Sequence, residues 1–214
     1  MGLLDGLKQA LGLKAEADAT READPDDLWG MSTAYVTMEA DLGYESAGLA
    51  ALCFATVDST DFEDALGNVE AILDAGEIET GTKADFVGDS HGYQWVVLED
   101  DTFEDLVTSI HFAADELIEQ GYGSRLLAAL FAFEKSGVDG HRNGGDTAAE
   151  TTAYWVYSFR RGAYYPFVPE SGKRERDSGA EFKLQSVLDG ELTVEDDKSY
   201  WYPMWPEGDA HPWG

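Results

Sequence analysis

The first alternation of apolar and polar residues falls in segment 31–42. Its apolar positions are Ala34, Val36, Met38 and Ala40. They are two residues apart, which is the period of a half-buried strand. After a predicted turn, segment 49–57 is apolar on both faces, and this pattern is typical of a central strand. The pattern thus predicts two strands in succession.

An amphipathic helix is predicted after these strands. Thr60-Asp61-Phe62-Glu63 has the form of a capping box, which satisfies backbone N–H groups in a first helical turn. Apolar residues then recur once per turn as far as Gly76, where we expect the helix to end. They are Phe62, Leu66, Val69, Ile72 and Leu73. The unit 31–78 therefore has the predicted order strand, strand, helix.

The same order is predicted for residues 82–121. Lys83–Gly88 and 93–98 have strand patterns, and Thr102 begins a capped helix that ends at Gly121. The sequence DFED at 61–64 is similar to TFED at 102–105. The two units are therefore candidates for a duplicated ββα repeat.

The pattern of residues 125–190 predicts a strand, a hairpin and a helix. The strand is 125–134, and after a glycine-rich loop the hairpin strands are 151–160 and 163–168. A capping box at 178–181 opens a helix that ends at Gly190. Its expected core face is Phe182, Leu184, Val187 and Leu188. We expect an α+β fold, with a mainly antiparallel sheet and amphipathic helices on one face.

This body, 28–190, is expected to be a single domain that follows a separate helix and a linker. Residues 1–14 predict a short helix with one apolar stripe, and residues 15–27 are polar and predict the linker. The stripe is Leu3, Leu4, Leu7 and Leu11, with Lys8 beside it. Such a helix lies on a membrane surface, in a partner's groove, or on its own domain.

Segment 191–214 is expected to be an aromatic, proline-rich tail. Its last fifteen residues hold three of the six tryptophans and half of the prolines, which exclude a helix. The tail is either an extended strap across the body or an exposed ligand for a partner.

The charge of the chain changes which partners are expected. Asp and Glu number 43 against 14 Lys and Arg, which gives a net charge of −29. This balance disfavours binding to nucleic-acid phosphates. The acids are spread from Asp5 to Asp209 rather than clustered, which favours a surface adapted to molar salt, where the screening length is about 3 Å. An acidic patch for a basic partner is the alternative.

Cysteine usage and hydropathy indicate the compartment. Cys53 is the single cysteine, so no internal disulfide is possible. No apolar run reaches the 18 residues of a membrane span, and the pattern of a signal peptide is lacking. We expect a cytoplasmic protein, peripheral on the inner membrane face if the first helix binds lipid.

The residues that carry chemistry form no known catalytic motif. Nucleophile-elbow, phosphate-loop and dinucleotide fingerprints are missing, and the four histidines are scattered. With one cysteine they offer no metal cluster, so we name no catalytic residue, metal or cofactor. The sequence favours a protein without enzymatic activity.

The few arginines are the more informative charges. Arg125, Arg160 and Arg161 lie at a strand start and a hairpin turn, and 173–176 is a second basic cluster. Arginines kept in so acidic a chain either bind a ligand's carboxylate or phosphate, or tie down neighbouring acids.

Several segments of the chain resemble one protein family. They are 1–8 (MGLLDGLK), 30–44 (GMSTAYVTMEADLGY), 121–128 (GYGSRLLA), 154–167 (YWVYSFRRGAYYPF) and 200–203 (YWYP). They resemble the haloarchaeal PspA-associated proteins of the PspAB family. The resemblance implies an accessory role in a phage-shock-like envelope stress response, with PspA or an HtpX-type membrane protease as partner. The predicted organisation is also similar to secretion-chaperone and YbjN-type folds, by pattern alone.

Three hypotheses of function follow. The first is a non-enzymatic adaptor that contacts a membrane or partner through the first helix and presents Tyr154, Trp155 and Tyr157 to a partner protein. The second is a hydrolase or ligand-binding enzyme with a pocket lined by Arg125, Arg160, His91 and Tyr93. The third is a self-associating structural protein, which would form a homo-oligomer.

Overall fold

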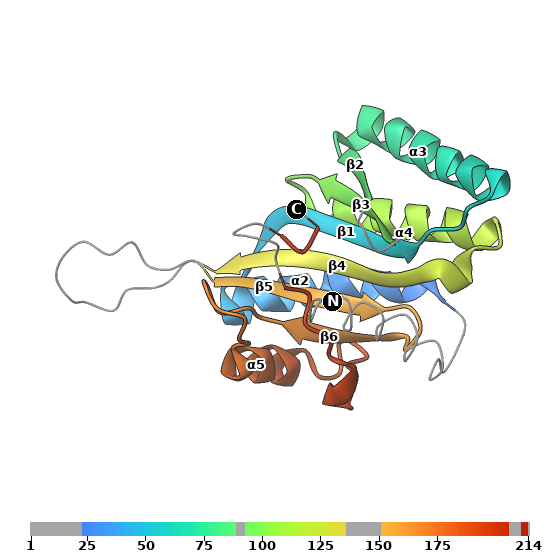
Figure 1. The fold of residues 1–214 in the computed structure, drawn as a ribbon. Helices are drawn as coiled ribbons and strands as arrows, with labels where there is room; N and C mark the ends of the chain where they lie inside the picture. The colour runs from blue at the N-terminus through green and yellow to red at the C-terminus, as the bar shows by residue number, and fades with distance from the viewer. Residues whose placement is uncertain (1–22, 89–92, 136–150, 206–210, 214) are drawn as a thin grey trace.

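The fold is built on a six-stranded antiparallel sheet with the order β2-β3-β1-β4-β5-β6 (Figure 1). The computed structural model describes residues 23–88, 93–135, 151–205 and 211–213. The strands are β1 (Glu45–Ala55), β2 (Lys83–Gly88), β3 (Tyr93–Glu99), β4 (Leu126–Lys135), β5 (Thr151–Ser158) and β6 (Ala163–Phe167). All strand pairs are antiparallel, as the alternating patterns predicted.

Helices cover one face of this sheet. The α-helices of the described residues are α2 (Gly30–Thr37), α3 (Thr60–Thr80), α4 (Phe103–Glu119) and α5 (Ser178–Leu188). Short helical turns are η1 (Pro25–Trp29), η2 (Met38–Leu42), η3 (Gly123–Arg125) and η4 (Lys198–Tyr200). Apolar side chains from all four α-helices pack in one cluster with residues of the sheet such as Leu52 and Phe131. The predicted α+β class is therefore confirmed.

The C-terminal segment covers the opposite face. Trp201 and Met204 are buried there, and Trp205 and Trp213 pack beside them, against strand residues such as Val156. A second cover is required because β4 and β5 are buried on both faces. Without the C-terminal segment, the large apolar side chains on this face would be in contact with water. The extended strap expected from the sequence is thus seen in residues 201–205 and 211–213.

Arg176 ties the C-terminal segment to the body. Its Nε atom donates to Glu181 Oε1 at 2.7 Å, and its Nη1 and Nη2 atoms donate to the carbonyls of Trp201 at 2.6 Å and Pro166 at 3.1 Å. The same Glu181 oxygen accepts the backbone N–H of Val168 at 3.0 Å. One guanidinium therefore joins β6, α5 and the tail through charge-assisted hydrogen bonds.

The predicted strand at 31–42 is wrong, because this segment is helical. It forms α2 and continues into the π-helical turn η2, and Gly43 ends it with φ 67°. The residues buried at one per turn are Leu28, Met31, Ala34, Met38 and Leu42. Val36, an apolar position of the predicted strand, is 61% exposed. The unit 31–78 therefore has the order helix, strand, helix, and no ββα duplication relates it to 82–121.

Three helix boundaries and one helix face also differ from the predictions. The helix α3 passes through Gly76 and ends at Gly81, whose φ of 93° suits a left-handed cap. Its N-cap is Ser59, one residue before the predicted box, and the N-cap of α5 is Asp177. Phe182 is 62% exposed because Glu181 turns inward to meet Arg176.

The folded body begins earlier than predicted, at the end of the proposed linker. Asp24 caps η1 by accepting the N–H of Asp26 at 3.1 Å, and Pro25 is buried. Residues 1–14 and the glycine-rich loop lie outside the described residues. None of the described helices is both long and apolar enough to cross a membrane.

Replacing Arg176 with glutamine should lower the free energy of unfolding by about 2–3 kcal/mol. Removing one partner of a buried ion pair costs roughly 3–5 kcal/mol, and the loss here should be below that range because the Arg176 side chain is 21% exposed. Urea unfolding at constant salt measures the change. Lys173→Gln is the control, because the Lys173–Glu170 pair is exposed and should contribute nothing measurable. Equal losses in both variants would contradict this role of Arg176.

Candidate functional site

The predicted aromatic surface at β5 is wrong, because its three residues are buried. Tyr154 and Trp155 are adjacent in the strand and point to opposite faces of the sheet. Tyr154 is covered by the tail, where its hydroxyl lies 3.0 Å from His211 Nδ1. Trp155 and Tyr157 are fully buried on the helical face. A protein partner therefore cannot dock on these side chains in this fold.

The arginines that the sequence suggested as a ligand surface do not bind in one place. Two of them, Arg160 and Arg161, contact neighbouring segments of the protein. Arg161 forms an ion pair with Glu195 at 2.7 Å and lies 4.0 Å from the centre of the Tyr200 ring. Arg160 donates to the carbonyl of Ser124 at 2.8 Å. Arg125 is exposed at the end of η3. Arg160 and Arg161 thus hold the hairpin turn against neighbouring segments.

The described residues of the enzyme hypothesis do not line either hollow described below. They are Arg125, Arg160 and Tyr93, which lie toward the same end of the sheet. His91 lies outside the described residues, as do Leu3, Leu4, Leu7, Lys8 and Leu11. Among the described residues, no group of three or more His, Cys, Asp or Glu side chains is arranged to hold a metal.

A hollow of about 260 Å³ lies where the first helical turn meets the sheet. The Tyr157 hydroxyl donates to Asp27 Oδ2 at 2.6 Å and also lies 3.2 Å from the carbonyl oxygen of Asp24. The Tyr164 hydroxyl donates to the carbonyl of Asp27 at 3.2 Å. These bonds fix the start of the body on β5 and β6. We interpret this hollow as part of that attachment, because its polar groups already bond to each other.

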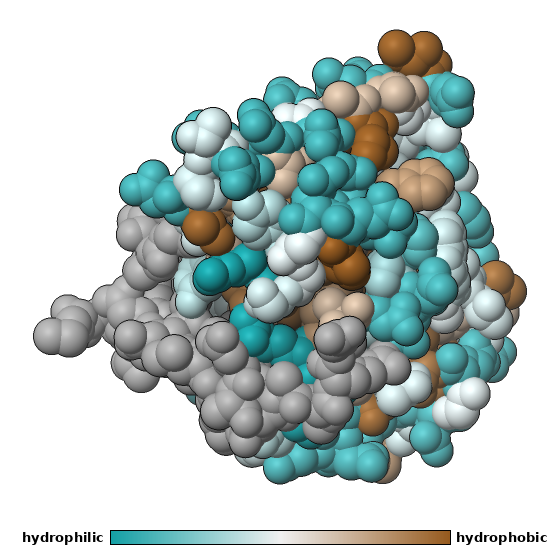
Figure 2. All heavy atoms as spheres, turned by 90° about the vertical axis from the view of Figure 1, so that its right-hand side faces the viewer, coloured by the Kyte–Doolittle hydropathy of each residue, from teal (hydrophilic) through white to brown (hydrophobic). Residues whose placement is uncertain are grey.

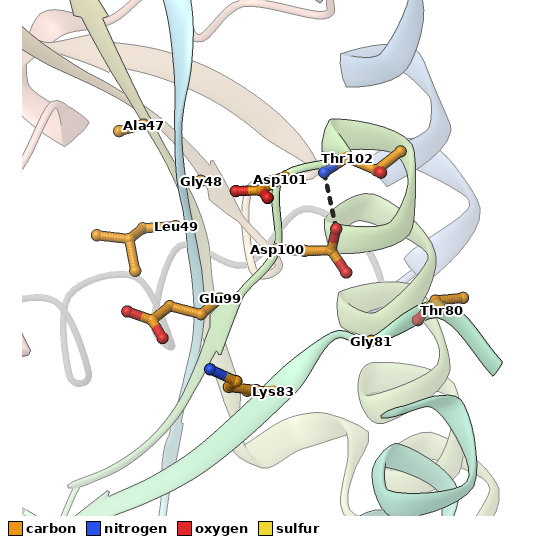
Figure 3. Close-up of a pocket in the computed structure, with 10 residues that line it drawn as sticks. All are labelled: Ala47, Gly48, Leu49, Thr80, Gly81, Lys83, Glu99, Asp100, Asp101 and Thr102. Carbon is orange, nitrogen blue, oxygen red and sulfur yellow. Dashed lines mark hydrogen bonds between the residues drawn. The ribbon is translucent and has the colours of Figure 1, made fainter. Parts of the chain in front are cut away.

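A larger hollow of about 640 Å³ opens beside the start of β2 (Figure 3). Its polar lining includes Lys83, Glu99, Asp100 and Asp101. Asp100 is engaged, because Oδ1 accepts the N–H of Thr102 at 2.7 Å and Oδ2 accepts the hydroxyl of Thr82 at 2.5 Å. Lys83, Glu99 and Leu49 lie together on one side of the sheet. This hollow adjoins the start of the edge strand β2.

Gly48 shapes the wall of this larger hollow. Its carbonyl accepts the N–H of Asp100 at 3.0 Å, and its φ of 70° lies in the left-handed region. A Cβ atom at this position would lie 3.2 Å from the carbonyl oxygen of Asp100. Both the backbone conformation and the close approach therefore favour glycine.

An aromatic cluster that the sequence reading missed lies on the helical layer. The His111 ring lies between Trp29, at 4.6 Å from ring centre to ring centre, and Phe112. Its Nε2 atom is 3.1 Å from Asp26 Oδ1. Trp29 is 40% exposed and Phe112 is 49% exposed. Asp24 followed by Pro25 is a common start of a helix, and this signal could have placed Trp29 in the folded body.

The face of the molecule that Figure 2 shows is mainly polar. On the face at the right of Figure 1, hydrophilic residues prevail and hydrophobic residues lie among them in small separate groups (Figure 2). Scattered apolar residues of this kind are normal for a soluble surface. A partner therefore finds no broad apolar patch among the residues drawn in colour on this face.

Alkaline pH should destabilise the fold through Tyr164. Burial, and then the neighbouring Tyr157, raise the pKa of Tyr164 well above its ordinary value. Above about pH 10 the unfolded chain loses the Tyr164 proton that the folded chain keeps, so Tyr164 alone lowers the free energy of unfolding by about 1.4 kcal/mol per pH unit. Tyr154 and Tyr165 add to this slope, because burial also raises their pKa values. Urea unfolding between about pH 9 and pH 11 measures this slope. Tyr164→Phe should make it shallower, and an unchanged slope would contradict the assignment.

The comparisons with known proteins identify the family. The family model described as PspA associated protein B matches residues 1–213, which is nearly the whole chain. The chain belongs to this family. No curated protein and no solved structure matches it.

Proposed function

We propose that this chain is a non-enzymatic accessory protein that binds a PspA-type protein. The observation that carries the proposal is the family match over residues 1–213, because the family is described as PspA-associated. The geometry supports a binding role at the periphery of the fold. The largest aromatic side chains are used to close the two sheet faces, so a partner contacts the exposed surface or an edge of the sheet.

The charge of the chain favours a partner segment that carries lysine or arginine. A net charge of −29 repels other acidic surfaces at low ionic strength. Opposite charges across an interface raise the association rate and exclude wrong partners. Exposed charge pairs are screened by salt, so the association should weaken as ionic strength rises.

We further propose that the association takes place at the cytoplasmic face of the membrane. The support comes from the sequence of residues 1–14, in which Leu3, Leu4, Leu7 and Leu11 form one apolar stripe with Lys8 beside it. A helix of this kind binds a lipid surface by burying its apolar face. An HtpX-type membrane protease is the second candidate partner on the same reasoning.

The full chain should form a complex with the purified PspA-type protein from the same organism. Isothermal titration calorimetry should give a Kd of about 1 µM or tighter, in the range of specific protein interfaces. A matched titration with an unrelated protein is the control. Absence of association up to roughly 100 µM, at both low and molar salt, would overturn the proposal. Light scattering on the chain alone separates this result from self-association.

Deleting residues 1–14 should abolish binding to lipid vesicles. Flotation with vesicles containing anionic lipid, in about 1 M salt, suppresses long-range charge effects and leaves the apolar contribution. A full-length variant with Leu4 and Leu7 changed to serine is the matched control for length. Equal flotation of all three proteins would refute the membrane contact and leave the protein partner untouched.

A further inference from the structure

The two outer edges of the sheet differ in what covers them. At β6 the tail supplies a cover, because Tyr164 donates its N–H to the carbonyl of Thr193 and accepts the N–H of Glu195, both at 2.8 Å. At the other end, β2 pairs with β3 on one side only. No strand or isolated bridge of the described residues pairs with the outer side of β2. Every second residue of β2 therefore directs its backbone N–H and C=O groups outward.

The side chains of β2 leave one face of this edge half open. Ala84 and Phe86 point to the helical face and pack against the core there. Lys83, Asp85 and Val87 alternate to the other face, and Val87 is 38% exposed. Val97, which lies opposite Asp85 in β3, is only partly buried. An added strand would place one set of its alternating side chains beside Ala84 and Phe86, and the other set beside Lys83, Asp85 and Val87.

The charges beside this edge are mainly negative. Glu99 lies opposite Lys83 in β3 and opposite Leu49 in β1. Asp100 and Asp101 line the adjoining hollow, in the view of Figure 3. Asp85 is exposed on β2 itself and is the acid nearest to an added strand, whereas Glu99 lies one strand further in, beyond Lys83. Opposite charges on neighbouring strands stabilise pairing and like charges oppose it.

We propose that the outer edge of β2 binds, by strand addition, an extended segment of the partner in which apolar residues alternate with lysine or arginine. The main-chain bonds supply affinity, and alternate side chains supply specificity. A second copy of this chain fits the edge less well, because it would bring together two molecules that each carry a charge of −29. This inference rests on the proposed function and names the surface that it uses.

The test uses the full chain and a labelled peptide of about eight residues that alternates lysine and valine. Fluorescence anisotropy at about 0.15 M salt gives the Kd. Val87→Lys should weaken binding about tenfold or more, because lysine on an edge strand repels a basic segment. Val36→Lys adds the same charge at an exposed position on α2 and should leave the Kd unchanged. A peptide that alternates glutamate and valine should not bind.

A backbone-modified peptide separates strand addition from attraction between charges. Two versions of the lysine–valine peptide are methylated on alternate backbone nitrogens, in the two possible alternations. The version that loses its edge-facing N–H donors should bind at least about tenfold more weakly than the other. Equal binding by both versions, or equal binding to the Val87→Lys and Val36→Lys variants, would overturn the proposal.

The same two variants distinguish this inference from the proposed function. If the PspA-type protein binds Val87→Lys as tightly as wild type, the edge is the wrong surface and the function stands. If that protein fails to bind wild type, the proposed function is wrong. The peptide measurements then still test strand addition at the outer edge of β2.

Discussion

The fold depends on the need to cover a sheet that is apolar on both faces. The central strands β4 and β5 bury side chains on each side, so a single layer of helices leaves half of the sheet in contact with water. The C-terminal segment supplies the second layer with Trp201 and Met204. It is held by Arg176, which joins the tail to β6 and α5. The tail is therefore part of the core.

This constraint also explains how the scarce cations are used. Arg176 pairs with the buried Glu181, and Arg161 pairs with the largely buried Glu195 beside the tail. Both bonds hold the C-terminal segment against β6. The other acids of the described residues are mostly exposed to solvent, and they shape the long-range field of the molecule. The internal pairs thus maintain the structure, while the excess negative charge supports the proposed preference for a basic partner segment.

Much of the fold could be predicted from the sequence, because alternation and capping signals are local. The strands β2 to β6 and the helix α4 follow their patterns closely. The strand prediction for segment 31–42 was wrong because its small and apolar residues fit both the two-residue period of a strand and the one-per-turn spacing of a helix. Only packing against the sheet selects the helix. The candidate functional site was harder to predict from the sequence. The burial of Tyr154 and Trp155 depends on covers that come from distant parts of the chain, and no local pattern reports whether an edge such as β2 stays open.

With both sheet faces covered, the outer edge of β2 is unpaired among the described residues and is the surface where we propose strand pairing with a partner. Hydrogen exchange on the full chain, with and without the PspA-type protein, tests this account most directly. The account predicts new protection of amides in residues 83–88, with unchanged exchange in 153–157 and 201–204. Unchanged exchange at 83–88, together with faster exchange at 201–204, would contradict it, because the partner would then displace the tail and bind the sheet face.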